Sequence, residues 1–270
     1  MRILRKRSVA LVLSACIVLG SALVMLLREE ETLTPATPEP PIAVTTPAPS
    51  PPPPSPPPLP TSTPGAQGEA GELLPLVLLE SGYGLEWAFD SYSVIYGFVL
   101  YNPNVDYGVT SPSVRITARA ADGSILGSQE IWTNQIRAGQ RIADAGHGFR
   151  VYEVPTAVEF EIIPPREWNW RRARDMTPLA YIPLSVENIS FPGGGSNARW
   201  VRVTGEVVNE NAYHFQSGNI VFLFRDEDGE IIGGHSTFFS ALAEHSRLPF
   251  DTSISGDRWS DNFEIHANPW

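Results

Sequence analysis

From residue 73 onward, apolar and polar positions alternate in short runs that are separated by Gly, Pro, Asn and Asp residues. In one of these runs, Ile220, Phe222 and Phe224 fall on a single face, as alternate residues of a strand do. No run has the spacing of a long amphipathic helix. The pattern therefore predicts an all-β protein built from short strands, as in a β-sandwich.

The strand pattern occurs twice. Three pairs of runs align, at offsets of 107, 106 and 103 residues: Val94–Asn104 with Val201–Asn211, Ile116–Ser128 with Phe222–Gly234, and Val158–Ile162 with Asp261–Ile265. Asn102 thereby meets Asn209, and Arg119 meets Arg225. The simplest explanation is a pair of tandem β-sandwich domains, which we place at residues 73–175 and 176–270.

Four acidic residues crowd the junction between two of the runs: Asp226, Glu227, Asp228 and Glu230. Such a cluster could bind a metal ion, but the first copy keeps only its Asp-Gly pair and has alanine or serine at the other three positions. The cluster also lacks the bidentate glutamate of a calcium loop. Because an Asp-Gly pair between alternating runs is a strong hairpin signal, we predict a turn here and no metal.

The second copy contains a motif that is similar to that of a known domain family. Phe222, Phe224 and Asp226 stand where the FxLYD-type domain of exported bacterial proteins has its Phe, Leu and Asp, and Arg225 replaces the Tyr. The second copy resembles this domain over about residues 181–268, and the first copy does so only through the internal repeat. The resemblance implies an immunoglobulin-like β-sandwich on a bacterial surface, and it implies no catalytic residues.

The N-terminal segment has a different character. Residues 1–7 contain four basic residues, whereas residues 8–27 are uncharged and mostly apolar. Those twenty residues would span about 30 Å as a helix, which crosses a bilayer core, and the preceding charge places residues 1–7 in the cytoplasm. We therefore expect a transmembrane anchor at residues 8–27. In the alternative, Leu13–Cys16 resembles a bacterial lipobox, and Cys16 carries a lipid anchor.

Residues 28–72 predict a disordered, proline-rich spacer. Of the 26 prolines in the chain, 15 lie between Pro35 and Pro64. Such a segment favours polyproline II and would reach roughly 90 Å when fully extended. Cys16 is the only cysteine, so the part of the chain outside the membrane forms no internal disulfide, which for an exported protein favours a bacterial source.

Charge and side-chain chemistry exclude several functions. Four of the 19 basic residues precede residue 8, so residues 28–270 combine 15 basic with 30 acidic residues and carry a formal charge of −15. A surface of that sign repels nucleic acid. The five histidines lack the spacing of a metal site, and no nucleophile motif is present. We expect a non-enzymatic protein without cofactor, metal or nucleic-acid partner.

One cluster combines aromatic and basic residues after the last run of the first copy: Arg166, Trp168, Trp170, Arg171, Arg172 and Arg174. We call it the Trp/Arg patch. Trp168 and Trp170 are two residues apart and would share one side of an extended segment. In one interpretation the tryptophans wedge between the two domains. In the other, indoles stack on sugars and guanidiniums pair with the anionic groups of a cell-wall polymer or an envelope protein.

The predicted function follows from this organisation. The chain is expected to be a membrane-anchored bacterial surface protein that presents two β-sandwich domains outside the cell for binding or scaffolding. The alternative is a glycan-binding module that uses the Trp/Arg patch.

Overall fold

The computed structural model describes residues 73–176, 180–191, 200–255 and 262–270, which all belong to one compact unit of the chain. The basic segment at residues 1–7, the expected anchor at residues 8–27, Cys16 and the spacer at residues 28–72 lie outside the described residues. Within the described ranges, no helix has the length and apolar character needed to cross a membrane.

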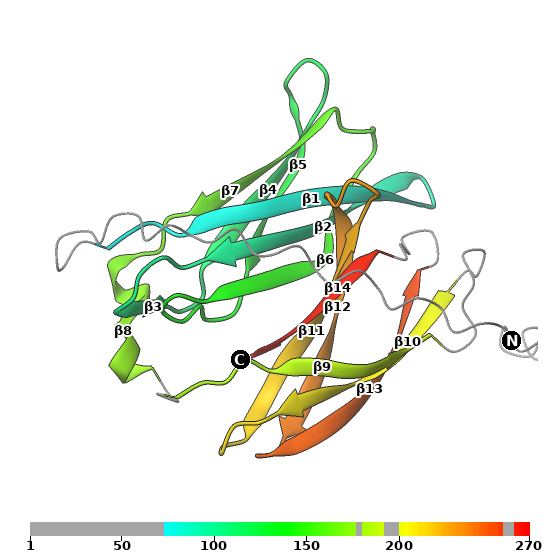
Figure 1. Cartoon of the computed structure of the whole chain (residues 1–270). Helices are drawn as coiled ribbons and strands as arrows, with labels where there is room; N and C mark the ends of the chain where they lie inside the picture. Colours follow the sequence, from blue (N-terminus) through cyan, green and yellow to red (C-terminus); the bar gives the residue numbers. More distant parts are fainter. Residues whose placement is uncertain (1–72, 177–179, 192–199, 256–261) are drawn as a thin grey trace, which may run out of the picture. The chain divides into compact units, whose positions relative to one another are not determined.

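The prediction of an all-β protein is confirmed. The first half, residues 73–176, contains these strands: β1 (Val77–Ala88), β2 (Ser91–Tyr101), β3 (Tyr107–Val109), β4 (Ser113–Arg119), β5 (Ile125–Trp132), β6 (Arg141–Val151), β7 (Ala157–Ile163) and β8 (Trp170–Arg172). Two short 3-10 turns flank β8, at Glu167–Asn169 and Ala173–Asp175. The strands form antiparallel sheets in the orders β1-β2-β6, β5-β4-β7 and β3-β8 (Figure 1).

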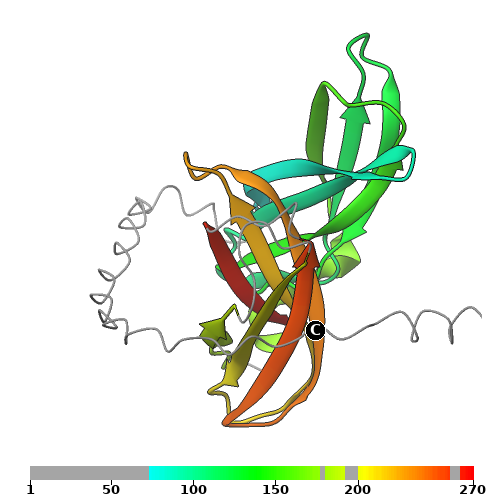
Figure 2. The same ribbon diagram turned by 90° about the vertical axis from the view of Figure 1, so that its right-hand side faces the viewer.

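The second half, from residue 180 onward, repeats this arrangement. Its strands are β9 (Ser185–Ser190), β10 (Trp200–Asn209), β11 (Phe215–Arg225), β12 (Ile231–Leu242), β13 (Ser246–Ser255) and β14 (Phe263–Pro269). The sheet β9-β10-β13 has the strand order of β1-β2-β6, and the sheet β12-β11-β14 has the order of β5-β4-β7. The sheets of both halves can be followed in Figures 1 and 2.

Each half has its own hydrophobic core. In the second half Ile220, Phe222 and Phe224 point into the core, as their alternation predicts. Phe98 and Ile116 are fully buried in the core of the first half. Burial of one such side chain contributes roughly 1.5 to 3 kcal/mol, so each of the two cores is a substantial source of stability.

The two halves also share a hydrophobic contact, which we call the seam. It consists of six buried residues from β2, β6, β11 and the start of β12: Val99, Ala143, Ala145, Val221, Leu223 and Ile231. Along β2 and β11, successive side chains point alternately into the core of their own half and into the seam. Both strands therefore contain seven consecutive buried residues. Two-sided burial of this kind replaces alternation with a continuous apolar run.

Glycines allow close backbone approach at the seam. A Cβ atom on Gly97 would lie 2.8 Å from Leu223 Cδ2, and one on Gly82 would collide with the main-chain carbonyl of Ile231. Several polar contacts also join the halves, and two of them are short. Asn268 Nδ2 donates a hydrogen bond to the Ala143 carbonyl at 2.9 Å, and Arg225 Nη2 lies 2.6 Å from Glu80 Oε2.

Each half contains the same pair of buried asparagines, which we call the asparagine clamp. In the first half, Asn102 Oδ1 accepts hydrogen bonds from the main-chain and side-chain N–H groups of Asn104, at 3.1 and 2.8 Å. Asn104 in turn exchanges two hydrogen bonds with the backbone of Leu74, at 2.9 and 2.8 Å. The second half repeats these bonds with Asn209, Asn211 and Ile182. The clamp therefore ties the entry of each half to the end of its second strand.

The predicted hairpin turn between Phe222 and Gly234 is confirmed. Asp226 Oδ1 accepts hydrogen bonds from the N–H groups of Asp228 and Glu230, at 3.1 and 2.9 Å. Gly229 has a φ of 86°, so the left-handed conformation falls on the glycine and not on the preceding aspartate. Gly229 N–H donates to the Asp226 carbonyl at 3.2 Å, and Asp226 N–H donates to the Glu230 carbonyl at 3.0 Å, which fits a loop with a bulged glycine that is longer than a two-residue turn.

Asp144 gives the first half a pH-dependent stability. Burial raises the pKa of this carboxyl from 3.8 to about 7, although Ala145 N–H and the Thr133 hydroxyl both hydrogen-bond to it. Because the folded pKa is the higher one, the stabilising contribution of the protonated group is complete below about pH 4. It is lost as the pH rises through about 7.

The replacement Asp144→Asn isolates this effect, because asparagine stays neutral at every pH. Through Asp144, the unchanged protein should lose stability as the pH rises from 4 to 7, and the variant should not. We therefore expect the difference in free energy of unfolding, variant minus unchanged protein, to increase by up to about 1.4 kcal/mol per pH unit over this range. Urea unfolding at several pH values measures this difference. His235, whose pKa burial lowers to about 4, titrates in both proteins and cancels. A difference that does not change with pH would contradict the prediction.

Candidate functional site

The segment that carries the Trp/Arg patch is fixed to the first half. β8 pairs with β3, so that Trp170 lies opposite Val109. Just before β8, the Asn169 carbonyl accepts a hydrogen bond from Thr110 N–H at 2.9 Å, and Asn169 Nδ2 donates to the Thr110 carbonyl at 3.0 Å. Beyond β8, Met176 is buried against Gly108. The patch thus stands on a supported strand, as a preorganised binding surface requires.

The two tryptophans of the patch have different surroundings. The expectation that they share one side of an extended segment is wrong, because Trp168 lies within the 3-10 turn Glu167–Asn169, whereas Trp170 begins strand β8. Trp168 is 64% exposed, and the Arg166 guanidinium carbon lies 5.0 Å from its ring centroid, which is cation–π distance. Trp170 is partly buried and packs against the core of the first half. Neither indole belongs to the hydrophobic cluster of the seam.

The arginines of the patch are exposed and mostly unpaired. Arg174 Nε lies 3.9 Å from Asp175 Oδ1, a long contact between two exposed groups. Across the part of the chain that the structure describes, Arg166, Arg171 and Arg172 have no carboxylate within ion-pair distance. Elsewhere, four arginines of the sheets pair with acids of the same sheet: Arg115 with Glu161, Arg119 with Glu159, Arg202 with Asp251, and Arg247 with Glu187 and Glu206. Among the described residues, Arg141 and Arg150 of β6 have no such partner. An acidic chain therefore leaves the positive charge of the patch available to a ligand.

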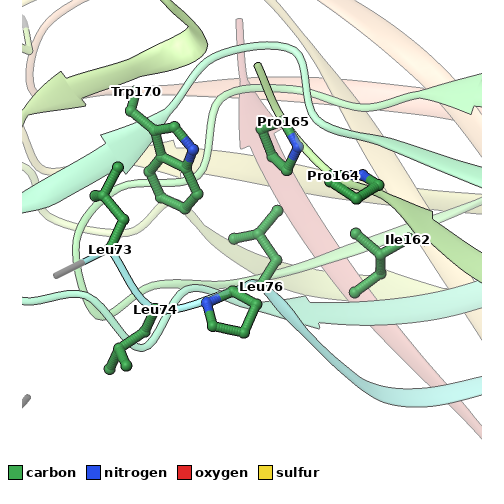
Figure 3. Close-up of a pocket in the computed structure, with 8 residues that line it drawn as sticks. Leu73, Leu74, Leu76, Ile162, Pro164, Pro165 and Trp170 are labelled. Carbon is green, nitrogen blue, oxygen red and sulfur yellow. The ribbon is translucent and has the colours of Figure 1, made fainter. Parts of the chain in front are cut away.

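An apolar pocket of about 400 Å³ adjoins the patch. Its lining residues come from the entry of the first half and from the end of β7 onward: Leu73, Leu74, Pro75, Leu76, Ile162, Pro164, Pro165 and Trp170. In Figure 3 the Trp170 indole and the Pro165 ring stand above Leu76, with Leu73 and Leu74 on the left and Ile162 and Pro164 on the right. The asparagine clamp holds one wall in place through its bonds to Leu74.

Trp170 is the one residue that the patch and the pocket share. The other residues of the pocket were not predicted from the sequence, because a leucine-rich segment before a strand and a Pro-Pro pair have no chemical signature of their own. The only available signal was the apolar run Leu73–Leu76 directly after the spacer. The patch and pocket together offer guanidinium groups beside an apolar hollow, and the described pocket lining contains no acid, base or nucleophile that could carry out a reaction.

No known family supplies further residues for this site. A scan of the sequence against protein-family models and a search of curated proteins both return no match. In the described ranges, no group of three or more His, Cys, Asp or Glu side chains is arranged to hold a metal ion.

Proposed function

We propose that the chain is a non-enzymatic, membrane-anchored bacterial surface protein that presents two immunoglobulin-like sandwiches of the FxLYD type outside the cell. The uncharged segment at residues 8–27, or a lipid on Cys16, would provide the anchor, and residues 28–72 the spacer. The repeated strand order and the separate core of each half support the two-sandwich interpretation.

The Trp/Arg patch is the proposed binding surface, and its ligand is an anionic polymer of the cell envelope. The observation that carries this proposal is the unpaired charge of Arg166, Arg171 and Arg172 on an otherwise acidic protein. Guanidinium groups bind phosphate and carboxylate through paired, charge-assisted hydrogen bonds. The exposed Trp168 ring adds a face on which a sugar ring can stack.

Binding of purified cell-wall polymer to residues 73–270 tests the proposal. This fragment contains every strand and both hydrophobic cores of the structure. We expect the double replacement Arg171→Ala and Arg172→Ala to weaken binding roughly tenfold at low salt, because two charge-assisted contacts are lost. Co-sedimentation with wall preparations at increasing salt concentration provides the measurement.

The matched control replaces Arg115 and Arg202 with alanine. Both are exposed arginines on the central strand of a three-stranded sheet, and each already has an acidic partner. We expect this control to bind the polymer as the unchanged fragment does. Equal binding by the two double variants, or no binding by the unchanged fragment, would refute the patch as the ligand site.

A further inference from the structure

The pocket next to the Trp/Arg patch has the chemistry of a hydrocarbon site. All the side chains that line it are leucine, isoleucine, proline or tryptophan, so none can hydrogen-bond a sugar hydroxyl except through the single indole N–H. Its volume of about 400 Å³ lies within the roughly 300–1,000 Å³ of small-molecule pockets. An apolar hollow of this size gains most from a ligand that removes its walls from water.

Two arginines lie within two residues of the pocket lining in the sequence. Arg166 directly follows Pro165, a lining residue. Arg172 follows Trp170 by two positions in β8, and alternate residues of a strand point to the same face. The Arg172 side chain is therefore on the same face of β8 as the Trp170 indole, which lines the pocket. Both arginines lack a carboxylate partner among the described residues. The segments that carry these two arginines therefore adjoin the apolar hollow, and the Arg166 guanidinium stacks on Trp168, two residues before the lining residue Trp170.

We propose that the pocket binds the hydrocarbon chain of an amphiphile whose phosphate head group is held by Arg166 and Arg172. This inference rests on the proposed function, because it assigns the lipid-linked end of an anionic envelope polymer to the pocket and the polymer itself to the patch. A purely polar polymer would leave the pocket empty, and a neutral lipid would leave the arginines unpaired. Only a ligand with both parts satisfies both features of the site.

Calorimetric titration of residues 73–270 with octyl phosphate, below its micelle concentration, tests the proposal. Inorganic phosphate and octyl glucoside serve as ligands that lack the chain and the charge, respectively. We expect octyl phosphate to bind at least tenfold more tightly than either. Along a butyl, hexyl and octyl phosphate series, each methylene that enters the pocket should tighten binding about fourfold.

Two variants separate the parts of the site. Leu73→Trp fills the pocket from its margin, where Leu73 is 36% exposed, and should abolish the preference for octyl phosphate over inorganic phosphate. The same variant should leave unchanged the binding of polymer that carries no lipid, because that polymer contacts only the patch. Arg172→Ala should weaken octyl phosphate and polymer alike, whereas Arg115→Ala should weaken neither.

The outcomes distinguish this inference from the proposed function. If the polymer binds but octyl phosphate binds no better than inorganic phosphate, the pocket assignment is overturned and the patch remains. If octyl glucoside binds as tightly as octyl phosphate, the assignment of the head group to the arginines is overturned. If neither polymer nor octyl phosphate binds the folded fragment, both proposals are wrong.

Discussion

Replacing Asn102 with alanine is expected to destabilise the first half by about 3 kcal/mol. The side chain is fully buried and donates to the carbonyls of Tyr107 and Arg137, at 2.7 and 3.0 Å. It also accepts two hydrogen bonds from Asn104. Alanine removes all four bonds and leaves their buried partners unpaired. A buried polar group without a partner costs more free energy than the loss of a hydrogen bond that water can replace. Urea unfolding of residues 73–270 measures the effect.

The repeat supplies a built-in comparison for this variant. Asn209 makes the equivalent bonds to the carbonyls of Tyr213 and Ala243, so Asn209→Ala should cost a similar amount. Asn262→Ala is the exposed control, because the hydrogen bond from its side chain to the Asp226 carbonyl is solvent-accessible. We expect a loss below about 1 kcal/mol. A loss at Asn102 no larger than the one at Asn262 would show that the clamp is not a stabilising element.

Introducing a charge into the seam is expected to separate the unfolding of the two halves. Leu223 is fully buried between β11 and the first half, and Leu223→Asp would place a carboxylate there without a partner. The cost of burying it should exceed about 3 kcal/mol, and the halves can avoid that cost by parting. Since each half has its own core, we expect two unfolding transitions in place of one.

Calorimetry and urea unfolding with two spectroscopic probes resolve these transitions. The control Leu223→Met conserves volume and polarity, and it should unfold in one step with a loss below about 1.5 kcal/mol. A single transition for Leu223→Asp, with stability close to that of the unchanged protein, would show that the seam does not couple the halves.

Short-range patterns were sufficient to predict the fold class and the turns. Alternation placed Phe222 and Phe224 in a core, and the Asp-Gly pair marked the hairpin. These features follow from local periodicity and turn chemistry, which one sequence contains in full. The seam was not predicted, although the unbroken apolar run from Ile220 to Phe224 is a sign of burial on both faces. The sequence does not show which strands pack against the seam face of β11, because those strands lie far from it in the chain.

The candidate site was predicted in part. The composition around Trp168 identified the patch, but the spacing of the two tryptophans could not reveal that Trp168 lies in a 3-10 turn. The pocket depends on Leu73 and Ile162 meeting across nearly ninety intervening residues, and no local pattern encodes that meeting. The pairing of Arg225 with Glu80 was missed for the same reason.

The bonds between Asn104 and Leu74 have a mechanical consequence. Everything ahead of residue 73 joins the body next to these two bonds, so tension along that segment acts first on the clamp and then on the start of β1. A ligand held at β8 would pull from the opposite wall of the same pocket. The shortest line of force then runs across the pocket within the first half, and the second half carries none of the load.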